Sequence, residues 1–154
     1  MAKLTKQERM IQNRIEELFS TSFNFLLQAE EKNLVKKGYK DLSVTEMHVI
    51  EAVQKSKTKA MNEVAKLLRI TPGSLTISAN RLVQKGYLDK RRDLEDKRMV
   101  FVETTPKGIQ VLKVHNRFHE KLIDNIMTID PVIEPKLFLS ILEKIDQYII
   151  ENES

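Results

Sequence analysis

The chain has 154 residues, with 26 Lys and Arg against 22 Asp and Glu, so it is long enough for a sizeable core and mildly basic at +4. It contains no cysteine, which excludes disulfides, thiol redox chemistry and thiolate metal sites. The excess of basic residues favours an anionic partner over a membrane surface. No apolar run is long enough to span a bilayer and the N-terminus lacks the apolar core of a signal peptide, so we expect a cytoplasmic protein.

Two helices are predicted in the first third of the chain. Apolar residues recur at three- and four-residue steps between about Thr5 and Glu31, which predicts one long amphipathic helix. Its stripe consists of Ile11, Ile15, Leu18, Phe19, Phe23, Leu26 and Leu27. Ser43 and Glu46 then have the spacing of a capping box, which predicts the start of a second helix that runs to about Gln54.

Residues 60–86 have the pattern of two short helices joined by a tight turn. The first helix has an apolar stripe at helical spacing, made of Met61, Val64, Ala65 and Leu68. The helical pattern is interrupted at 69–70. Directly after it, Thr71 is a good N-cap and Pro72 suits the first position of the next helix. The second helix should end near Lys85, because Gly86 favours a left-handed cap.

The second of these helices has a composition that suits a DNA groove. Its outward positions near the start are small or hydrogen-bonding, with no acid among them: Gly73, Ser74, Thr76, Ile77 and Asn80. Hydroxyl and amide groups can reach base edges, and an exposed methyl group can contact the methyl of thymine. Ordinary surface helices also contain many Ser and Thr, so this helix alone leaves both interpretations open.

A basic hairpin is predicted directly after the second helix. Residues 87–92 and 99–104 are strand-like and flank a polar tip at 93–98. Between Arg81 and Arg98 there are seven basic and four acidic residues. Such a hairpin is usually only a solvated surface feature, but its attachment to a helix-turn-helix favours contact with phosphates and the minor groove.

The C-terminal part is predicted to be helical. Thr105 and Pro106 repeat the cap-plus-proline start, and the helix should run to about Met127. The helical pattern is then interrupted by Asp130-Pro131 and Pro135, and a last helix follows to about Glu151. The first and last helices carry wider apolar stripes than a small winged domain can cover. They pack either within one chain or against the same helices of a second copy.

Several motifs resemble those of the MarR family of winged helix-turn-helix repressors. The wing signature is represented by Asp96-x-Arg98, alternating apolar residues and Thr105-x-x-Gly108, preceded by Leu82-x-x-Lys85-Gly86-Tyr87-Leu88. Within that family the chain is most similar to FabT-type repressors of fatty-acid biosynthesis genes. The shared segments are Glu46-Met47-His48, Gly73-x-x-Thr76-x-Ser78-x-Asn80, Lys85-Gly86-Tyr87 and His115-x-x-Phe118-His119. The resemblance covers nearly the whole chain; one departure is Thr104, where the family usually has leucine.

The resemblance implies a mostly α-helical fold with a small β-hairpin wing. It divides the chain into an N-terminal dimerisation helix and linker (1–42), a winged helix-turn-helix DNA-binding domain (43–105) and C-terminal dimerisation helices (106–154). It also implies a homodimeric repressor that binds a pseudo-palindromic operator in double-stranded DNA.

The expected DNA-binding residues come from the second helix and from the wing. The helix contributes Thr71, Gly73, Ser74, Thr76, Ile77, Asn80 and Arg81, and the wing contributes Lys90, Arg91, Arg92, Asp96, Lys97 and Arg98. We expect Ser74, Thr76, Ile77 and Asn80 to read bases, and Arg98, held by Asp96, to enter the minor groove. The remaining cations, Arg81, Lys90, Arg91, Arg92 and Lys97, would bind phosphates.

The effector expected from the resemblance is an acylated acyl carrier protein acting as corepressor. The channel that binds its acyl chain would be lined by Phe19, Phe23, Leu27, His115, Phe118 and His119. His115 and His119 also have a helical spacing that can chelate zinc, with His48 as a further candidate. Because the sequence does not supply a complete ligand set, we expect no metal or cofactor, and a zinc-responsive regulator of the same family is the alternative.

Two other classes of function are alternatives to a DNA-binding regulator. A winged-helix module that binds protein would have little salt-dependent affinity for duplex DNA. An enzyme is not expected, because the chain has no nucleophile elbow, no phosphate-binding glycine loop and only four glycines.

Overall fold

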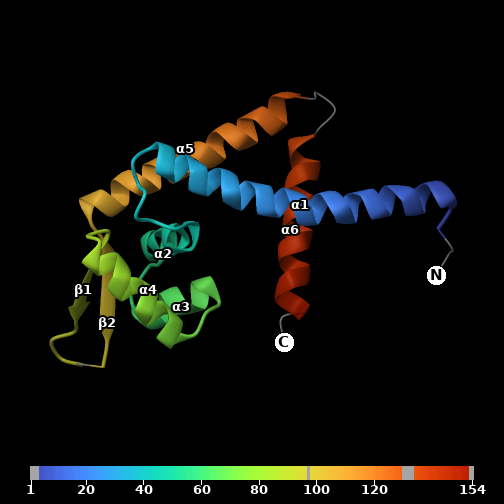
Figure 1. Cartoon of the computed structure of the whole chain (residues 1–154). Coiled ribbons are helices and arrows are strands. Elements are labelled where there is room, and N and C mark those ends of the chain that lie inside the picture. Colours follow the sequence, from blue (N-terminus) through green and yellow to red (C-terminus); the bar gives the residue numbers. More distant parts are fainter. Residues whose placement is uncertain (1–3, 97, 130–133, 153–154) are drawn as a thin grey trace. The chain divides into compact units, whose positions relative to one another are not determined.

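The computed structural model describes residues 4–96, 98–129 and 134–152. Within them the elements follow the order α1 (Lys6–Lys36), α2 (Val44–Lys55), α3 (Met61–Leu68), α4 (Pro72–Gln84), β1 (Leu88–Arg92), β2 (Val100–Thr104), α5 (Pro106–Ile129) and α6 (Pro135–Asn152) (Figure 1). They form two compact units, Met1–Asn116 and Arg117–Ser154. No helix among the described residues has the length and apolarity needed to cross a membrane.

The first two helices begin at capping boxes. At α1 the Thr5 hydroxyl accepts a hydrogen bond from the Glu8 N–H, and the Glu8 carboxylate accepts one from the Thr5 N–H at 2.7 Å. Ser43 and Glu46 cap α2 in the same way, as predicted. The predicted end of α1 at Glu31 is wrong, because no proline or glycine interrupts the helix before Gly38, where φ is +95°.

The predicted helix-turn-helix is confirmed as α3 and α4. Arg69 adopts a left-handed conformation at the end of α3, and the Thr71 hydroxyl accepts a hydrogen bond from the Ser74 N–H at 3.1 Å. Pro72 occupies the first position of α4. The helix ends before Gly86, whose φ of +75° lets the chain turn into the wing.

One face of α4 packs into the hydrophobic core of the first unit. Leu75, Ala79 and Leu82 of this helix are fully buried. They belong to one cluster with residues of α2, α3 and the wing, namely Met47, Ile50, Val53, Val64, Ala65, Tyr87, Leu88 and Val102. Burying a large aliphatic side chain stabilises a fold by roughly 1.5–3 kcal/mol, so this face fixes the orientation of the helix.

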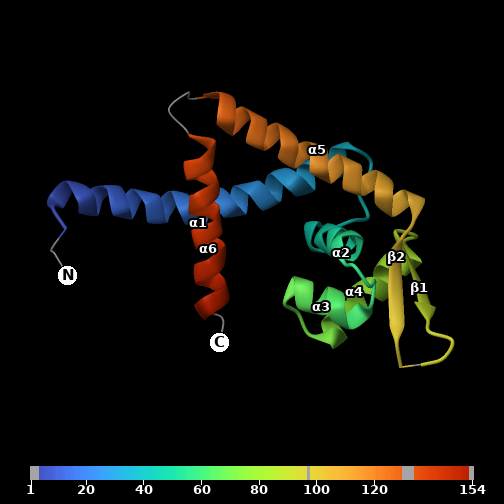
Figure 2. The same ribbon diagram turned by 180° about the vertical axis from the view of Figure 1, so that it is seen from behind.

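The hairpin and its neighbours complete the first unit. Strands β1 and β2 are antiparallel, with Leu88 opposite Thr104 and Arg92 opposite Val100. An isolated bridge between Ala60 and Phe101 ties the start of α3 to β2. Figure 2 shows the hairpin beside α4 from the reverse side. The predicted start of α5 at Pro106 is confirmed, whereas the predicted break at Asp130–Pro131 lies outside the described residues.

Candidate nucleic-acid interface

The face of α4 opposite the core is exposed and carries no acidic residue. Every residue predicted to contact DNA from this helix and its cap lies on the exposed surface: Thr71, Gly73, Ser74, Thr76, Ile77, Asn80 and Arg81. Ile77 is the most informative, because a branched aliphatic side chain is 56% exposed there. Its methyl groups form an apolar surface that can contact a thymine methyl in a major groove.

The hydroxyl groups of this face make short local hydrogen bonds. The Thr71 and Ser74 hydroxyls are 2.8 Å apart, and the Thr76 hydroxyl donates to the Pro72 carbonyl at 2.8 Å. A hydroxyl that donates to the backbone keeps its acceptor lone pairs for another partner. The start of α4 therefore presents hydroxyl acceptors and small side chains to a ligand.

Lys90 at the base of the wing contacts the helix. Its Nζ donates to Asn80 Oδ1 at 2.9 Å, and both side chains are exposed. An asparagine whose oxygen is occupied still has two free N–H donors on Nδ2. Lys90 therefore orients the Asn80 amide so that its NH₂ group is available to acceptors on a base edge.

The tip of the wing is built on two aspartates. Asp93 Oδ1 accepts from the N–H groups of Glu95 and Asp96 at 2.9 and 3.0 Å. These backbone hydrogen bonds lower the pKa of Asp93. Asp96 Oδ1 in turn accepts from the N–H of Arg98 at 2.9 Å. The predicted support of Arg98 by Asp96 is thus a contact with its backbone, which positions this exposed residue.

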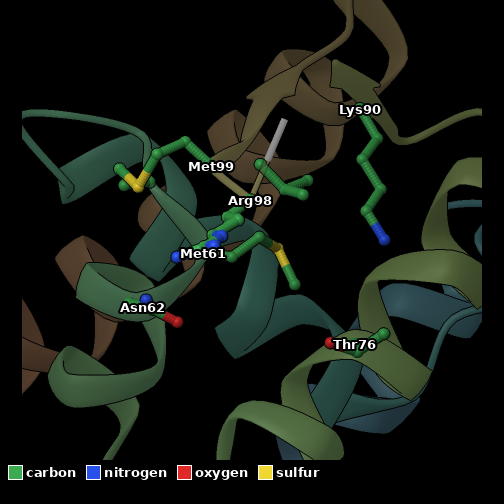
Figure 3. A pocket seen from close by; sticks show the side chains of 8 residues that line it. Met61, Asn62, Thr76, Lys90, Arg98 and Met99 are labelled. Atoms are coloured by element: carbon green, nitrogen blue, oxygen red, sulfur yellow. The ribbon is translucent and has the colours of Figure 1, made fainter. Parts of the chain in front are cut away.

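A pocket of about 240 Å³ lies between α3, α4 and the wing. Its lining residues are Ala60, Met61, Asn62, Thr76, Lys90, Arg98, Met99 and Val100. Figure 3 shows that Lys90 and Arg98 reach it from the wing, with Thr76 on the helix across from them. The two cations, Lys90 and Arg98, make this pocket suitable for an anionic group such as a phosphate.

The other predicted wing cations differ in their surroundings. Arg91 is held against the sheet, because its Nε is 3.2 Å from Glu103 Oε1 and its guanidinium carbon lies 4.8 Å from the centre of the Phe101 ring. Arg92 is exposed at the end of β1. Lys97 lies outside the described residues.

A polar cluster that the sequence did not reveal joins the end of α4 to α2. Lys85 Nζ is 2.7 Å from both carboxylate oxygens of Glu46, and the Tyr87 hydroxyl donates to Asp41 at 2.8 Å. Lys107 Nζ lies 3.9 Å from the centre of the Tyr87 ring and donates to the Lys85 carbonyl at 2.8 Å. From the sequence, Glu46 is expected only to cap the start of α2 as part of the capping box. Its long-range partner depends on tertiary packing.

The Glu46–Lys85 pair should stabilise the fold in a pH-dependent way. Burial raises the pKa of Glu46, but the hydrogen bonds from Lys85 and the Ser43 backbone outweigh it and lower the pKa below its ordinary value of 4.5. The carboxylate therefore stabilises the fold above that value, and the contribution is lost as the pH falls through the lower pKa of the folded state. Glu46→Gln, which can still cap α2, should cost about 1–2 kcal/mol at pH 7.

Urea denaturation of this variant and the wild type at several pH values measures that cost. The difference in unfolding free energy should begin to shrink as the pH falls below 4.5, where the unfolded chain takes up the proton, and should be lost once the pH has fallen through the lower pKa of Glu46 in the folded state. A difference that is independent of pH would mean that the charge of Glu46 is not its contribution.

The residues predicted to bind an effector come from two helices, α1 and α5. Phe19 and Phe23 are exposed on α1 with ring centres 5.0 Å apart, and Leu27 is exposed on the same helix. His115 is buried, with its ring 5.6 Å from that of His48. Phe118 and His119 belong to the second unit, where their ring centres are 5.5 Å apart.

The chain is similar to known transcriptional regulators. Residues 31–114 match the family described as Transcriptional regulator SarA/Rot. The chain is 27% identical over 129 residues to the HTH-type transcriptional regulator BilQ of Clostridium symbiosum, covering 83% of this chain and 85% of BilQ. It is 30% identical over 91 residues to the multiple antibiotic resistance protein MarR of Salmonella typhimurium, covering 56% of this chain and 63% of that protein.

Solved structures give the same result. Streptococcus pneumoniae FabT in complex with DNA has a TM-score of 0.78 and 30% identity, covering 91% of this chain and 98% of FabT. A Staphylococcus aureus MepR–DNA complex, with a TM-score of 0.71 and 14% identity over 88% of this chain and 95% of MepR, supports the fold alone. The relatives are regulators and not enzymes, which confirms the predicted class. The chain belongs to the MarR and SarA/Rot family of winged helix-turn-helix proteins and is a DNA-binding transcriptional regulator.

Proposed function

We propose that this protein is a homodimeric repressor that reads a pseudo-palindromic operator with α4 and the wing. The observation that carries this proposal is the acid-free, exposed face of α4 beside the cations Lys90 and Arg98. Ser74, Thr76, Ile77 and Asn80 read base edges in the major groove, and Arg98 enters the adjacent minor groove. The cations that bind phosphates and set the register on the duplex are Arg81, Lys90, Arg91, Arg92 and Lys97.

Residues 43–105 form the DNA-binding part in this proposal, and residues 1–42 and 106–154 form the dimer. Support comes from the large apolar side chains that one chain leaves exposed on α1 and α6: Ile11, Ile15, Leu18, Phe19, Phe23, Leu27, Leu137, Leu139, Ile141, Leu142, Ile149 and Ile150. Each of these two helices exposes a row of large apolar side chains, and monomers rarely expose large apolar patches. A two-fold symmetric dimer would also place two copies of α4 about one helical turn of DNA apart.

Sedimentation equilibrium tests the dimer. The wild type should sediment as a dimer, and Phe23→Glu should shift the mass toward the monomer, because it buries a carboxylate in the interface. Leu94→Glu is the control, since this side chain is 95% exposed at the wing tip and outside the proposed dimer surface. A wild type that sediments as a monomer at all concentrations would contradict the homodimer.

The regulated genes in this proposal are those of fatty-acid biosynthesis, with an acylated acyl carrier protein as corepressor. It is supported by the resemblance of the sequence to FabT-type repressors and by the likeness of the fold to FabT over 91% of the chain. Of the residues predicted to bind the acyl chain, Phe19, Phe23 and Leu27 are exposed on α1. DNA binding measured with acylated carrier protein, with unacylated carrier protein and with none tests it; equal affinity in all three contradicts the corepressor.

Lys90 has a second role in this proposal, because it orients Asn80. Lys90→Ala should lower the salt slope of binding by about one and also relax discrimination at the base pair that Asn80 reads. Arg92→Ala is the matched control; it should lower the salt slope equally and weaken all sequences evenly. Binding to a set of single-base operator variants measures both effects. If Lys90→Ala leaves the ranking of these variants unchanged, Lys90 does not orient Asn80.

A further inference from the structure

Two histidines and a glutamate from three different helices converge inside the first unit. Glu30 comes from α1, His48 from α2 and His115 from α5. One ligand atom of each lies within 4.8 Å of the others. Glu30 and His115 are 3% and 2% exposed, so this is an internal cluster, with the half-buried His48 at its outer side.

The distances in this cluster are close to those of a metal site. His48 Nε2 is 3.6 Å from Glu30 Oε2. In a tetrahedral zinc site with bonds of about 2.0–2.1 Å, neighbouring ligand atoms are roughly 3.4 Å apart. Because the three ligand atoms lie within 4.8 Å of one another, each pair needs to approach by no more than about 1.4 Å to reach this spacing.

A fourth group of suitable chemistry lies beside the cluster. Glu51 Oε2 is 3.9 Å from His115 Nε2, and Glu51 follows His48 by three positions on α2. Its carboxylate can complete the coordination or accept a hydrogen bond from a ligand imidazole, which orients the ring. Two neutral imidazoles with one or two carboxylates carry a charge that a divalent cation balances.

We propose that Glu30, His48 and His115 bind a divalent transition-metal ion of the zinc type, with Glu51 as fourth ligand or supporting partner. Imidazole and carboxylate ligands without thiolate suit Zn²⁺ and neighbouring divalent ions and are poor ligands for soft Cu⁺. Sequence spacing had pointed to His115 with His119. The folded chain instead brings His115 to His48 and to Glu30, which lies four residues before the buried Leu34 on α1.

Such an ion would link α1, the helix with the exposed apolar side chains, to the proposed DNA-binding part, residues 43–105. It would connect α1 and α5 to α2, and α2 holds the end of α4 through Glu46 and Lys85. Occupancy of the site should therefore change DNA affinity, and this consequence rests on the proposed function. The binding of the ion itself does not.

Metal binding by the full-length, chelator-treated protein tests the site without DNA. Zn²⁺ titrated against a chromogenic chelator should bind at one ion per chain, and Co²⁺ should give the absorption of a four-coordinate ion. Glu30→Gln and His48→Gln should each lower Zn²⁺ affinity by more than about 100-fold, beyond the roughly 10- to 100-fold typical of a lost outer partner. His48 is partly exposed, so this variant tests the site even if Glu30→Gln unfolds the chain.

Glu31→Gln is the matched control, because Glu31 is the exposed neighbour of Glu30 on the same helix, and its Zn²⁺ affinity should equal that of the wild type. Absence of stoichiometric Zn²⁺ binding by the wild type, or equal affinity in Glu30→Gln, His48→Gln and Glu31→Gln, would overturn the site. Zn²⁺ binding that leaves operator affinity unchanged would overturn only the link to DNA. A wild type that binds Zn²⁺ but no operator would contradict the proposed function and leave the site standing.

Discussion

Gly108→Ala is expected to destabilise the protein by about 3 kcal/mol, although alanine is a better helix former than glycine. A Cβ atom at position 108 would lie 2.3 Å from the Tyr87 carbonyl oxygen, and that atom belongs to the backbone. Tyr87 connects the end of α4 to β1 and is fully buried. The start of α5 and the base of the wing would have to move apart.

The hydrogen bonds around Gly108 make this movement costly. The Thr105 hydroxyl donates to the Gly86 carbonyl at 2.7 Å and accepts from the Gly108 N–H at 3.1 Å. The Thr105 N–H donates to the Tyr87 carbonyl at 3.1 Å. These bonds hold α5, the end of α4 and β1 together, so the Thr105-x-x-Gly108 motif has a physical reason in close backbone packing.

Thermal and urea unfolding measure this effect, with Gly73→Ala as the control. At Gly73 the nearest atom to an added Cβ is 3.9 Å away, so alanine should stabilise the helix there by roughly 0.5–1 kcal/mol. Opposite signs for the two substitutions are the expected result. A Gly108→Ala protein as stable as the wild type would mean that α5 and the wing base are not packed this closely.

Arg98→Ala should weaken operator binding by about 1–3 kcal/mol, roughly 5- to 150-fold. Arg98 is an exposed residue beside the wing tip, and the Asp96 carboxylate positions its backbone. An arginine in the minor groove gains most where A·T pairs narrow the groove and strengthen its negative potential. The loss should therefore depend on the base pairs beneath the wing.

A double-mutant cycle between protein and DNA isolates this contact. Replacing the A·T pairs under the wing with G·C should weaken the wild type but have little further effect on Arg98→Ala. Circular dichroism should show an unchanged fold, because Arg98 is exposed. If the DNA change weakens both proteins equally, Arg98 does not read the minor groove.

Local signals in the sequence were sufficient for the helix starts and for the wing. Capping residues such as Ser43 and Thr71 act within three positions along the chain, so their effect can be recognised without a structure. The end of α1 was less predictable. Its exposed apolar stripe gives out after Leu27, yet residues to Lys36 remain helical because nothing in the sequence stops them.

Long-range polar contacts were not predictable, because they depend on how the elements pack. The Glu46–Lys85 pair spans 39 positions and the Tyr87–Asp41 hydrogen bond spans 46. The buried position of Glu30 was partly predictable, because Glu30 lies four positions before Leu34 on the same face of α1. A carboxylate at an apolar-face position indicates a buried partner, but the partner's identity requires the fold.

Operator binding over a salt series tests the central proposal most directly. Fluorescence anisotropy of the purified protein on the DNA upstream of its own gene, with a scrambled duplex as control, gives both affinity and salt slope. The proposal predicts specific binding that exceeds the control by roughly 10³-fold or more and falls steeply with salt. Equal affinity for both duplexes at every salt concentration would contradict sequence-specific reading of this promoter by α4 and the wing.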